Sequence, residues 1–157
     1  GKGTIHVRDV PNADNLNSAI EYYLQVGDCM KTETQALLRL YAQIVNEPCF
    51  NMLRTQEQLG AYQDFEDVIS EMSDVEYNKH RTAVIAKLLE KYKNLGEESS
   101  QLWGHVSSGY YEFARNAEIA EIVKDIPKSA ILDLYDMHIS PSSLSRRKLS
   151  VHVRSVK

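Results

Sequence analysis

Hydrophobic periodicity changes twice along the 157-residue chain, and the order of these changes constrains the fold more than any other feature. Apolar and polar residues alternate in residues 4–8, 18–26 and 148–153, as in half-buried strands. Between the second and third segments, apolar residues recur at the spacing of amphipathic helices. This order predicts an α+β fold, with helices packed on one face of a small, mostly antiparallel sheet.

Capping residues and helix breakers predict the boundaries of the first helices. Thr32 and Ser73 are each followed three residues later by Gln or Glu, the capping-box pattern that begins a helix. We expect Pro48 to end or kink the first helix, because proline cannot donate a backbone hydrogen bond. A short helix over residues 50–58 is then expected to stop at Gly60.

The second half of the chain predicts three more helical segments. We expect Gly96 to interrupt a long helix that contains residues 77–95, and another helix to begin near residue 102. A short helix is expected at residues 115–123. Pro127 is placed in the first turn of a last helix, where proline is tolerated. The inner face of that helix is expected to carry Ile131, Leu134, Tyr135 and His138.

Composition describes an ordinary soluble domain, which we expect to comprise residues 1–157. The chain is 43% hydrophobic and 25% charged, with a formal net charge of −4. This charge argues against nucleic acid as a partner, and we interpret the basic cluster at residues 146–148 as a solvated approach to the last strand. No apolar run is long enough for a membrane span, so no membrane partner is expected.

The chain ends and the cysteines suggest a setting inside a larger cytoplasmic protein. The N-terminus lacks both an initiator Met and the apolar stretch of a signal peptide, so we expect the chain to start inside a larger protein or after a removed tag. Cys29 and Cys49 lie far apart and form no metal-binding motif. We expect two free thiols in a reducing compartment and a cytoplasmic location.

Histidines are the first candidates for metal binding, but their spacing argues against it. None of the five lies four residues from another, as two zinc ligands on one helix would. His6 and His152 lie in predicted strands and could be neighbouring ligands, although we favour the interpretation as partly exposed strand residues. His80 and His138 lie on or beside apolar helical faces, where we expect hydrogen-bonded packing.

Acidic and aromatic groups also favour structural roles. Glu97 with Glu98, and Glu118 with Glu121, are more typical of solvated helix faces than of acid–base pairs, since nothing nearby would bury them. Trp103 shares a helical face with neighbouring apolar residues, and we expect it to pack in the core or at a helix junction. The alternative is a ligand wall of Trp103, Tyr110 and Tyr111. By spacing alone, the chain is a structural or binding domain without a catalytic centre.

The longest distinctive segment is residues 47–60, Glu-Pro-Cys-Phe-Asn-Met-Leu-Arg-Thr-Gln-Glu-Gln-Leu-Gly. It resembles a signature in the last domain of the insulinase family, the insulin-degrading-enzyme-like and pitrilysin-type zinc metallopeptidases. Residues 102–106, 124–135 and 148–153 resemble later parts of that domain, in the same order. The resemblance implies a C-terminal, fourth-type domain of a peptidase that is built from four homologous α+β domains.

The family's zinc motif, H-x-x-E-H, belongs to its first domain and is absent from this sequence. The resemblance therefore implies a fragment of a zinc metalloendopeptidase that forms chamber wall, with zinc as cofactor of the parent and none bound by this chain. It implies peptide substrates and the remaining domains as partners, and no cleavage by this chain alone. The alternative is a stand-alone, non-catalytic protein-interaction domain of the same fold.

Arg54 is the one site residue that the resemblance implies. It matches the family's signature arginine, which reaches the substrate near the zinc, and a guanidinium suits a peptide carbonyl or a developing oxyanion. Without the resemblance, Arg54 could simply pair with Glu57 one helical turn away. We therefore assign Arg54 to substrate binding, and no residue of the chain to catalysis or metal binding.

The chain departs from the family pattern directly after Gly60. Ala61 stands where the family has a tyrosine, and we do not transfer that role to Tyr62. Two strands with their connections, on the order of thirty residues, are expected to be missing here. Such a loss would expose sheet edges, which predicts a homo-oligomer through strand pairing or exchange.

Overall fold

The computed structural model describes residues 2–12, 14–51 and 65–155. It comprises two compact units: residues 1–27 with 133–157, which hold the sheet, and residues 28–132, which hold the helices. Among the described residues there are six α-helices and three strands, so the predicted α+β class is confirmed. No described helix combines the length and the apolar character that a membrane crossing requires.

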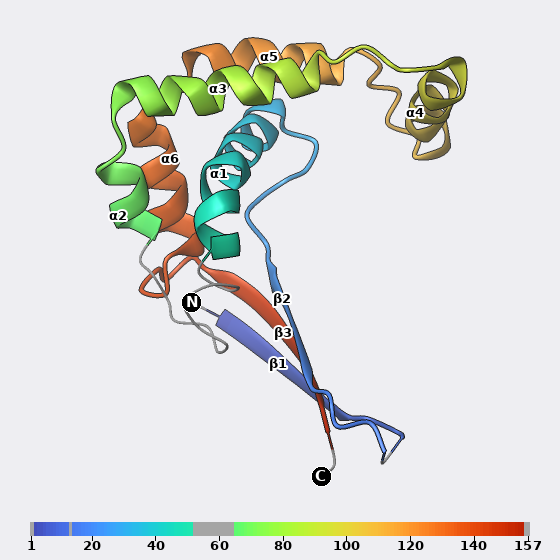
Figure 1. Ribbon diagram of the computed structural model, residues 1–157, viewed down its shortest axis with the longest axis vertical. Helices are drawn as coiled ribbons and strands as arrows, with labels where there is room; N and C mark the ends of the chain where they lie inside the picture. The colour runs from blue at the N-terminus through green and yellow to red at the C-terminus, as the bar shows by residue number, and fades with distance from the viewer. Residues whose placement is uncertain (1, 13, 52–64, 156–157) are drawn as a thin grey trace. The chain divides into compact units, whose positions relative to one another are not determined.

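The sheet unit contains β1 (Lys2–Asp9), β2 (Ala19–Leu24) and β3 (Arg147–Arg154). Their spatial order is β1-β3-β2, so the last strand of the chain lies between the first two (Figure 1). The β2–β3 pair is antiparallel, whereas β1 and β3 are parallel. The prediction of a mostly antiparallel sheet is therefore corrected to a mixed one, because the closing strand inserts between the first two instead of extending an edge.

One side-chain ion pair and one backbone hydrogen bond join the strands at the two ends of this sheet. Arg154 contacts the Asp9 carboxylate across the β1–β3 pair, with Nη2 and Oδ1 3.1 Å apart. At the other end, the Gln25 N–H donates to the Arg147 carbonyl at 3.0 Å and continues the β2–β3 ladder by one residue. The three strands are therefore in register along nearly their whole length.

The helical unit is built around α1 (Thr32–Asn51), α3 (Asp74–Leu88) and α5 (Arg115–Asp125). Each of these three helices packs against the other two. The remaining helices of this part of the chain are α2 (Phe65–Ser70), α4 (Leu95–Ser107) and α6 (Lys128–Leu134). The core that α1, α3 and α5 share with α2 and α6 is apolar; its most deeply buried large side chains are Leu40, Ile44, Ile69, Ile119, Val123 and Ile131.

Two predicted helix boundaries differ from the structure for physical reasons. Pro48 lies inside α1, which continues to Asn51, so the expectation that Pro48 ends the helix is wrong, while a kink there stays a prediction. Proline at this position removes one hydrogen bond to the Ile44 carbonyl without ending the helix. Gly96 lies in the first turn of α4 and does not interrupt a helix. The break comes earlier, because α3 ends at Leu88 and Asn94 then caps α4 by accepting from the Glu97 N–H at 2.9 Å.

Other predicted features agree with the structure. The Ser73 hydroxyl accepts from the Glu76 N–H at 3.2 Å, as the capping-box pattern predicts. Of the four residues predicted for the inner face of the last helix, Ile131, Leu134 and Tyr135 are buried, whereas His138 is only half-buried. It continues into a π-helical turn, η2 (Tyr135–Ile139), which ends where the Ser140 N–H donates to the Tyr135 carbonyl at 2.8 Å. The expected helix over residues 50–58 begins within α1, and the rest of it lies outside the described residues.

Candidate functional site

Arg54, the residue predicted to contact substrate, lies outside the described residues, as do residues 52–64 as a whole. Its assignment therefore stays a prediction.

The described histidines are not arranged as metal ligands. In the sheet, His6 is the cross-strand neighbour of Val151 and His152 that of Val7, so the two imidazoles occupy adjacent rows on opposite faces. His152 Nε2 instead lies 2.8 Å from the Ser150 hydroxyl. In residues 2–12, 14–51 and 65–155, no three His, Cys, Asp or Glu side chains gather as a metal site would require.

The predicted carboxylate pairs have local structural roles. Glu97 accepts from the Lys93 N–H at 2.8 Å and so closes the start of α4. Glu121 forms an exposed ion pair with Lys124, one turn later on α5, with 2.5 Å between the charged atoms. Glu97 and Glu98 both line one open pocket of the helical unit, which Lys87, Lys91 and Lys93 line as well. Lysine side chains around the two carboxylates fit the structural role predicted for them better than acid–base chemistry.

Burial perturbs three ionisable groups of the helical unit. It raises the pKa of Tyr41, and the neighbouring Cys49 raises that pKa further. Burial likewise raises the pKa of the Cys49 thiol. It also raises the pKa of Tyr77, against an opposing effect of Arg81. All three shifts favour the neutral forms near neutral pH, so these groups act there as packing residues and not as nucleophiles or bases.

One pocket lies wholly within the sheet unit, where β2 and β3 diverge. Its volume is about 480 Å³, within the usual range for small-ligand sites. The end of β2, η2 and the approach to β3 line it, with residues Gln25, Val26, Gly27, His138, Leu144, Ser145, Arg146 and Arg147. From the sequence, the basic cluster at residues 146–148 was interpreted as a solvated approach to the last strand. Its position beside His138 was not predicted.

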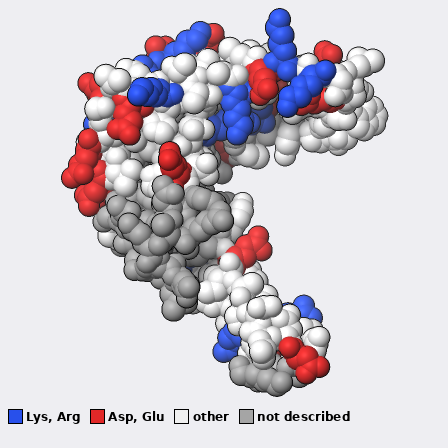
Figure 2. Space-filling model, in the orientation of Figure 1, with Lys and Arg blue, Asp and Glu red and all other residues white. Residues whose placement is uncertain are grey.

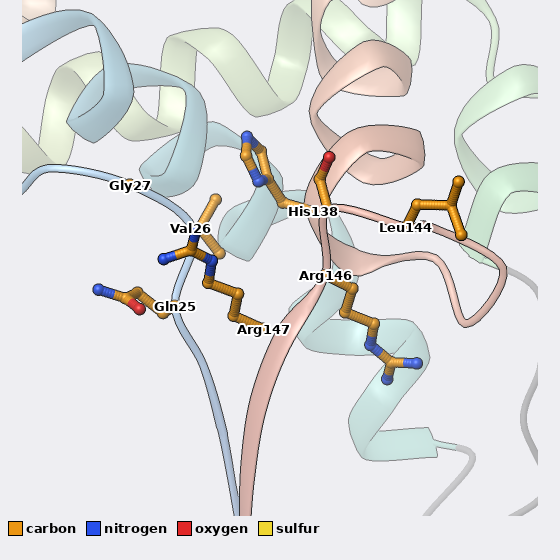
Figure 3. A pocket seen from close by; sticks show the side chains of 8 residues that line it. Gln25, Val26, Gly27, His138, Leu144, Arg146 and Arg147 are labelled. Carbon is orange, nitrogen blue, oxygen red and sulfur yellow. The ribbon is translucent and has the colours of Figure 1, made fainter. Parts of the chain in front are cut away.

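The two arginines of this pocket differ in their contacts. Arg146 is buried; its guanidinium stacks 5.6 Å from the Tyr22 ring centroid and donates to the Tyr22 hydroxyl. Arg147 extends toward Val26, on the side of the pocket where Gln25 and His138 lie, whereas Arg146 points away from them (Figure 3). The described lining contains basic and amide groups but no carboxylate, so it could bind a carboxylate or peptide carbonyl.

An exposed apolar face on α4 is a second candidate surface. It consists of Leu95, Leu102, Trp103 and Val106, which line one shallow groove together with Glu98 and Ser99. Trp103 is 67% exposed and Leu95 80%. The surface over α4 is largely uncharged in Figure 2, whereas Lys, Arg, Asp and Glu are interspersed over the adjacent helices.

The prediction that Trp103 packs in the core is therefore wrong. The helical spacing correctly placed Trp103 with Leu102 and Val106 on one face, but that face is not covered by the described residues of the helical unit. Tyr110 and Tyr111 are also exposed, and nearby the His105 and Phe113 rings meet edge to face, with 5.7 Å between centroids.

Comparisons with known proteins locate the chain within a larger architecture. No family model matches it. It is 33% identical to "Putative zinc protease mug138" of Schizosaccharomyces pombe, over 99% of this chain and 20% of that protein. It is 28% identical to the A-factor-processing enzyme of Saccharomyces cerevisiae, over 99% of the chain and 18% of that enzyme. The chain is homologous to the insulinase-family peptidases. Human insulin-degrading enzyme is 32% identical over 90% of the chain and 17% of its own length.

A solved structure shares the fold of this chain. The crystal structure of pitrilysin superposes with a TM-score of 0.75 and 18% identity, over 98% of this chain and 20% of pitrilysin. The chain thus spans about one fifth of the length of its insulinase-family relatives, which corresponds to one domain of such a protein.

The alignment length also bears on the expected deletion. The alignment with the Schizosaccharomyces pombe relative extends over 190 positions, whereas this chain has 157 residues, so at least 33 positions of that alignment have no residue here. This agrees with a loss on the order of thirty residues. The predicted place of the loss, after Gly60, lies outside the described residues.

Proposed function

We propose that this chain is the C-terminal, fourth-type domain of an insulin-degrading-enzyme-like zinc metalloendopeptidase, and that it is non-catalytic by itself. The observation that carries the proposal is the 33% identity over 99% of the chain with one fifth of a zinc-protease relative. Because the identity extends over nearly the whole chain, we infer that the chain is still part of a larger enzyme, as the matching segment of the relative is.

Zinc is the cofactor of the proposed parent, and the described residues do not fit a zinc site. A catalytic zinc needs three protein ligands, and no such group occurs in the described part of the chain. The full sequence also lacks H-x-x-E-H. In this proposal the metal and its activated water belong to another domain, while this domain forms chamber wall and excludes water from the bound peptide.

Arg54 is the residue that we propose to contact the substrate. Its guanidinium has five N–H donors in a rigid fork, which can bind a peptide carbonyl and stabilise negative charge as that carbonyl is attacked. Arg54 would thereby contribute to turnover without touching the metal. The proposed compartment is the cytoplasm, in keeping with the two free thiols of Cys29 and Cys49.

The alternative proposal is a stand-alone interaction domain, and the exposed α4 apolar face favours it. The transcript that encodes the chain separates the two proposals. An upstream H-x-x-E-H in the same reading frame supports the peptidase domain, whereas a start codon immediately before Gly1 contradicts it and supports the interaction domain.

In the full-length parent, Arg54→Ala should lower kcat by about 10²-fold, the cost of removing one stabilising donor, with unchanged zinc content. Arg39→Ala is the matched control, since Arg39 is exposed on α1. Peptide hydrolysis and elemental analysis measure both effects. Equal kinetics for the two variants would remove Arg54 from the substrate site.

A further inference from the structure

The outer edge of β1 has no neighbouring strand among the described residues. β1 pairs with β3 on one side along eight residues, from Lys2 opposite Arg147 to Asp9 opposite Arg154. The order β1-β3-β2 leaves β1 at the border of the sheet (Figure 1). An unpaired border strand is a template for another strand, and natural proteins usually protect it.

The direction of the backbone groups along β1 follows from one hydrogen bond. The Val10 N–H donates to the Arg154 carbonyl at 2.8 Å, so residue 10 points toward β3. Backbone groups alternate in direction along a strand, so the even-numbered residues of β1 point inward to β3. The N–H and C=O groups of Gly3, Ile5, Val7 and Asp9 therefore point away from the sheet.

The side chains along this edge offer little protection. Ile5 and Val7 share one face of the sheet and are 60% and 44% exposed. The four outward-pointing positions contain no proline or lysine, the usual protective residues. The one charge among them, Asp9, is neutralised within the chain by Arg154. An apolar strand edge thus remains available for pairing.

We propose that β1 pairs antiparallel with β1 of a second copy of this chain, centred on His6. A two-fold axis perpendicular to the sheet keeps each face continuous, and the outward-pointing residues must then oppose one another. Centring on His6 places Ile5 opposite Val7 of the second copy, twice by symmetry. Gly3 lies opposite Asp9 in the same arrangement, and all four pairs exchange backbone hydrogen bonds.

The neighbouring registers are less favourable for identifiable reasons. Centring on Ile5 places Val7 opposite Gly3, so each Val7 loses its apolar cross-strand partner. Centring on Val7 places Ile5 opposite Asp9 and His6 opposite Arg8, and shortens the overlap. Only the His6-centred register keeps both apolar residues of β1 paired with apolar residues.

The resulting dimer contains one continuous six-stranded sheet, in the order β2-β3-β1-β1-β3-β2. Stable interfaces bury on the order of 1,200 Å² or more, and a single pair of strand edges provides a smaller contact. Exchange between monomer and dimer at micromolar or higher concentrations is therefore expected. The inference needs only the sheet unit and does not depend on the proposed peptidase function, so each can fail without the other.

Sedimentation equilibrium between about 10 µM and 1 mM tests the proposal, with proline substitutions at two strand edges. Ile5→Pro removes an outward N–H of β1, and Ile20→Pro does the same at the opposite edge of the sheet, because Gln25 fixes the direction of the β2 backbone. The wild-type chain and Ile20→Pro should dimerise, whereas Ile5→Pro should show at least a tenfold higher Kd. A monomeric wild type, or loss of the dimer only in Ile20→Pro, would overturn the proposal.

Charge substitutions repeat this test without altering the backbone, in case a proline variant fails to fold. Val7→Lys places a charge in the proposed apolar pair, and Ile20→Lys places one at the 68%-exposed position of the other edge. Far-ultraviolet circular dichroism verifies that each variant is folded. Dimerisation should be lost in Val7→Lys alone, and equal Kd values for the two variants would contradict the model.

Cross-linking tests the register itself. In the His6-centred register the two His6 residues form a non-hydrogen-bonded pair, with Cα atoms about 4.5 Å apart, which is within disulfide range. In a background of Cys29→Ser and Cys49→Ser, mild oxidation should link His6→Cys into a covalent dimer. Thr4→Cys, two residues away on the same face, should remain monomeric. Equal cross-linking of both variants would exclude this register.

Discussion

The helices α3 and α4 begin in the same way and differ in what they bury. Each starts at a side-chain cap, Ser73 or Asn94, and each has two acidic residues in its first turn, which suit a helix N-terminus. α3 nevertheless buries Tyr77, Val84 and Leu88 against the helical core, whereas α4 buries none of its side chains. Local chemistry therefore forms both helices, and tertiary contact distinguishes them.

Polar contacts reinforce the burial of α3. The Tyr77 hydroxyl donates to the Ile126 carbonyl at 3.1 Å, and Arg81 donates to the Lys124 carbonyl at 2.6 Å. Both interactions supply donors to carbonyl groups at the C-terminal end of α5. These carbonyls lack N–H partners within the helix, because no further helical turn follows. The side-chain hydrogen bonds of Asn94, Glu97 and Ser107 at α4, by contrast, join groups at most four residues apart, so they stabilise the helix locally.

The largest expected difference between the two helices comes from leucine truncation. Leu88→Ala, at the buried end of α3, should lower the free energy of unfolding by about 2–4 kcal/mol, because it removes core contacts and leaves a cavity. Leu95→Ala, at the exposed start of α4, should change it by less than about 0.5 kcal/mol. Denaturation in urea measures both. A similar loss in the two variants would show that α4 is buried after all.

A smaller effect is expected from loss of the Tyr77 hydroxyl. Tyr77→Phe removes one hydrogen bond to the Ile126 carbonyl and should cost about 1 kcal/mol, since Arg81 Nη1 still lies 3.4 Å from that oxygen. Tyr92→Phe, in the exposed segment between α3 and α4, is the matched control. Urea denaturation of the pair should separate them. Equal stability of Tyr77→Phe and wild type would remove this contact from the account.

Loss of the N-terminal cap should lower global stability in the case of α3, but only local stability in the case of α4. Ser73→Ala should lower global stability by about 0.5–1 kcal/mol, because unfolding of α3 disrupts the core. Asn94→Ala removes an equivalent cap, yet it should mainly speed amide hydrogen exchange in the first turn of α4. Denaturation combined with hydrogen exchange distinguishes the two results. A global loss from Asn94→Ala as large as that from Ser73→Ala would show that α4 unfolds together with the core.

The smallest effect is expected at Trp103. Trp103→Ala should leave the free energy of unfolding within about 0.5 kcal/mol, because the indole is mostly exposed. As the only tryptophan, Trp103 should emit at nearly the same wavelength in the folded and unfolded chain and be readily quenched by iodide. Strongly shifted emission with poor quenching would show that another surface covers the α4 apolar face.

The same contrast explains how much of the fold the sequence predicts. Alternation located all three strands, and the Ser73 cap was predicted, because both depend on residues close together in the chain. The position of β3 between β1 and β2 depends on pairing between residues about 145 apart, which periodicity does not encode. Trp103 was misplaced for a related reason: its spacing identifies an apolar face but not what covers that face.

The candidate site was less predictable than the fold. The family signature gave Arg54, which lies outside the described residues, and nothing in the residue spacing indicated the pocket beside Arg147. That pocket joins residues 25–27 to residues 138–147, and only the meeting of β2 with β3 brings them together. The two adjacent arginines were a visible signal, but their proximity to His138 required the three-dimensional structure.

The proposed non-catalytic role is tested most directly by metal content and peptide cleavage of the purified 157-residue chain. After incubation with zinc and removal of excess metal, elemental analysis should find well below one zinc per chain. A fluorogenic peptide that insulin-degrading enzyme cleaves should remain intact. Stoichiometric zinc together with cleavage that a chelator abolishes would contradict the account, because the metal centre would then lie within this domain.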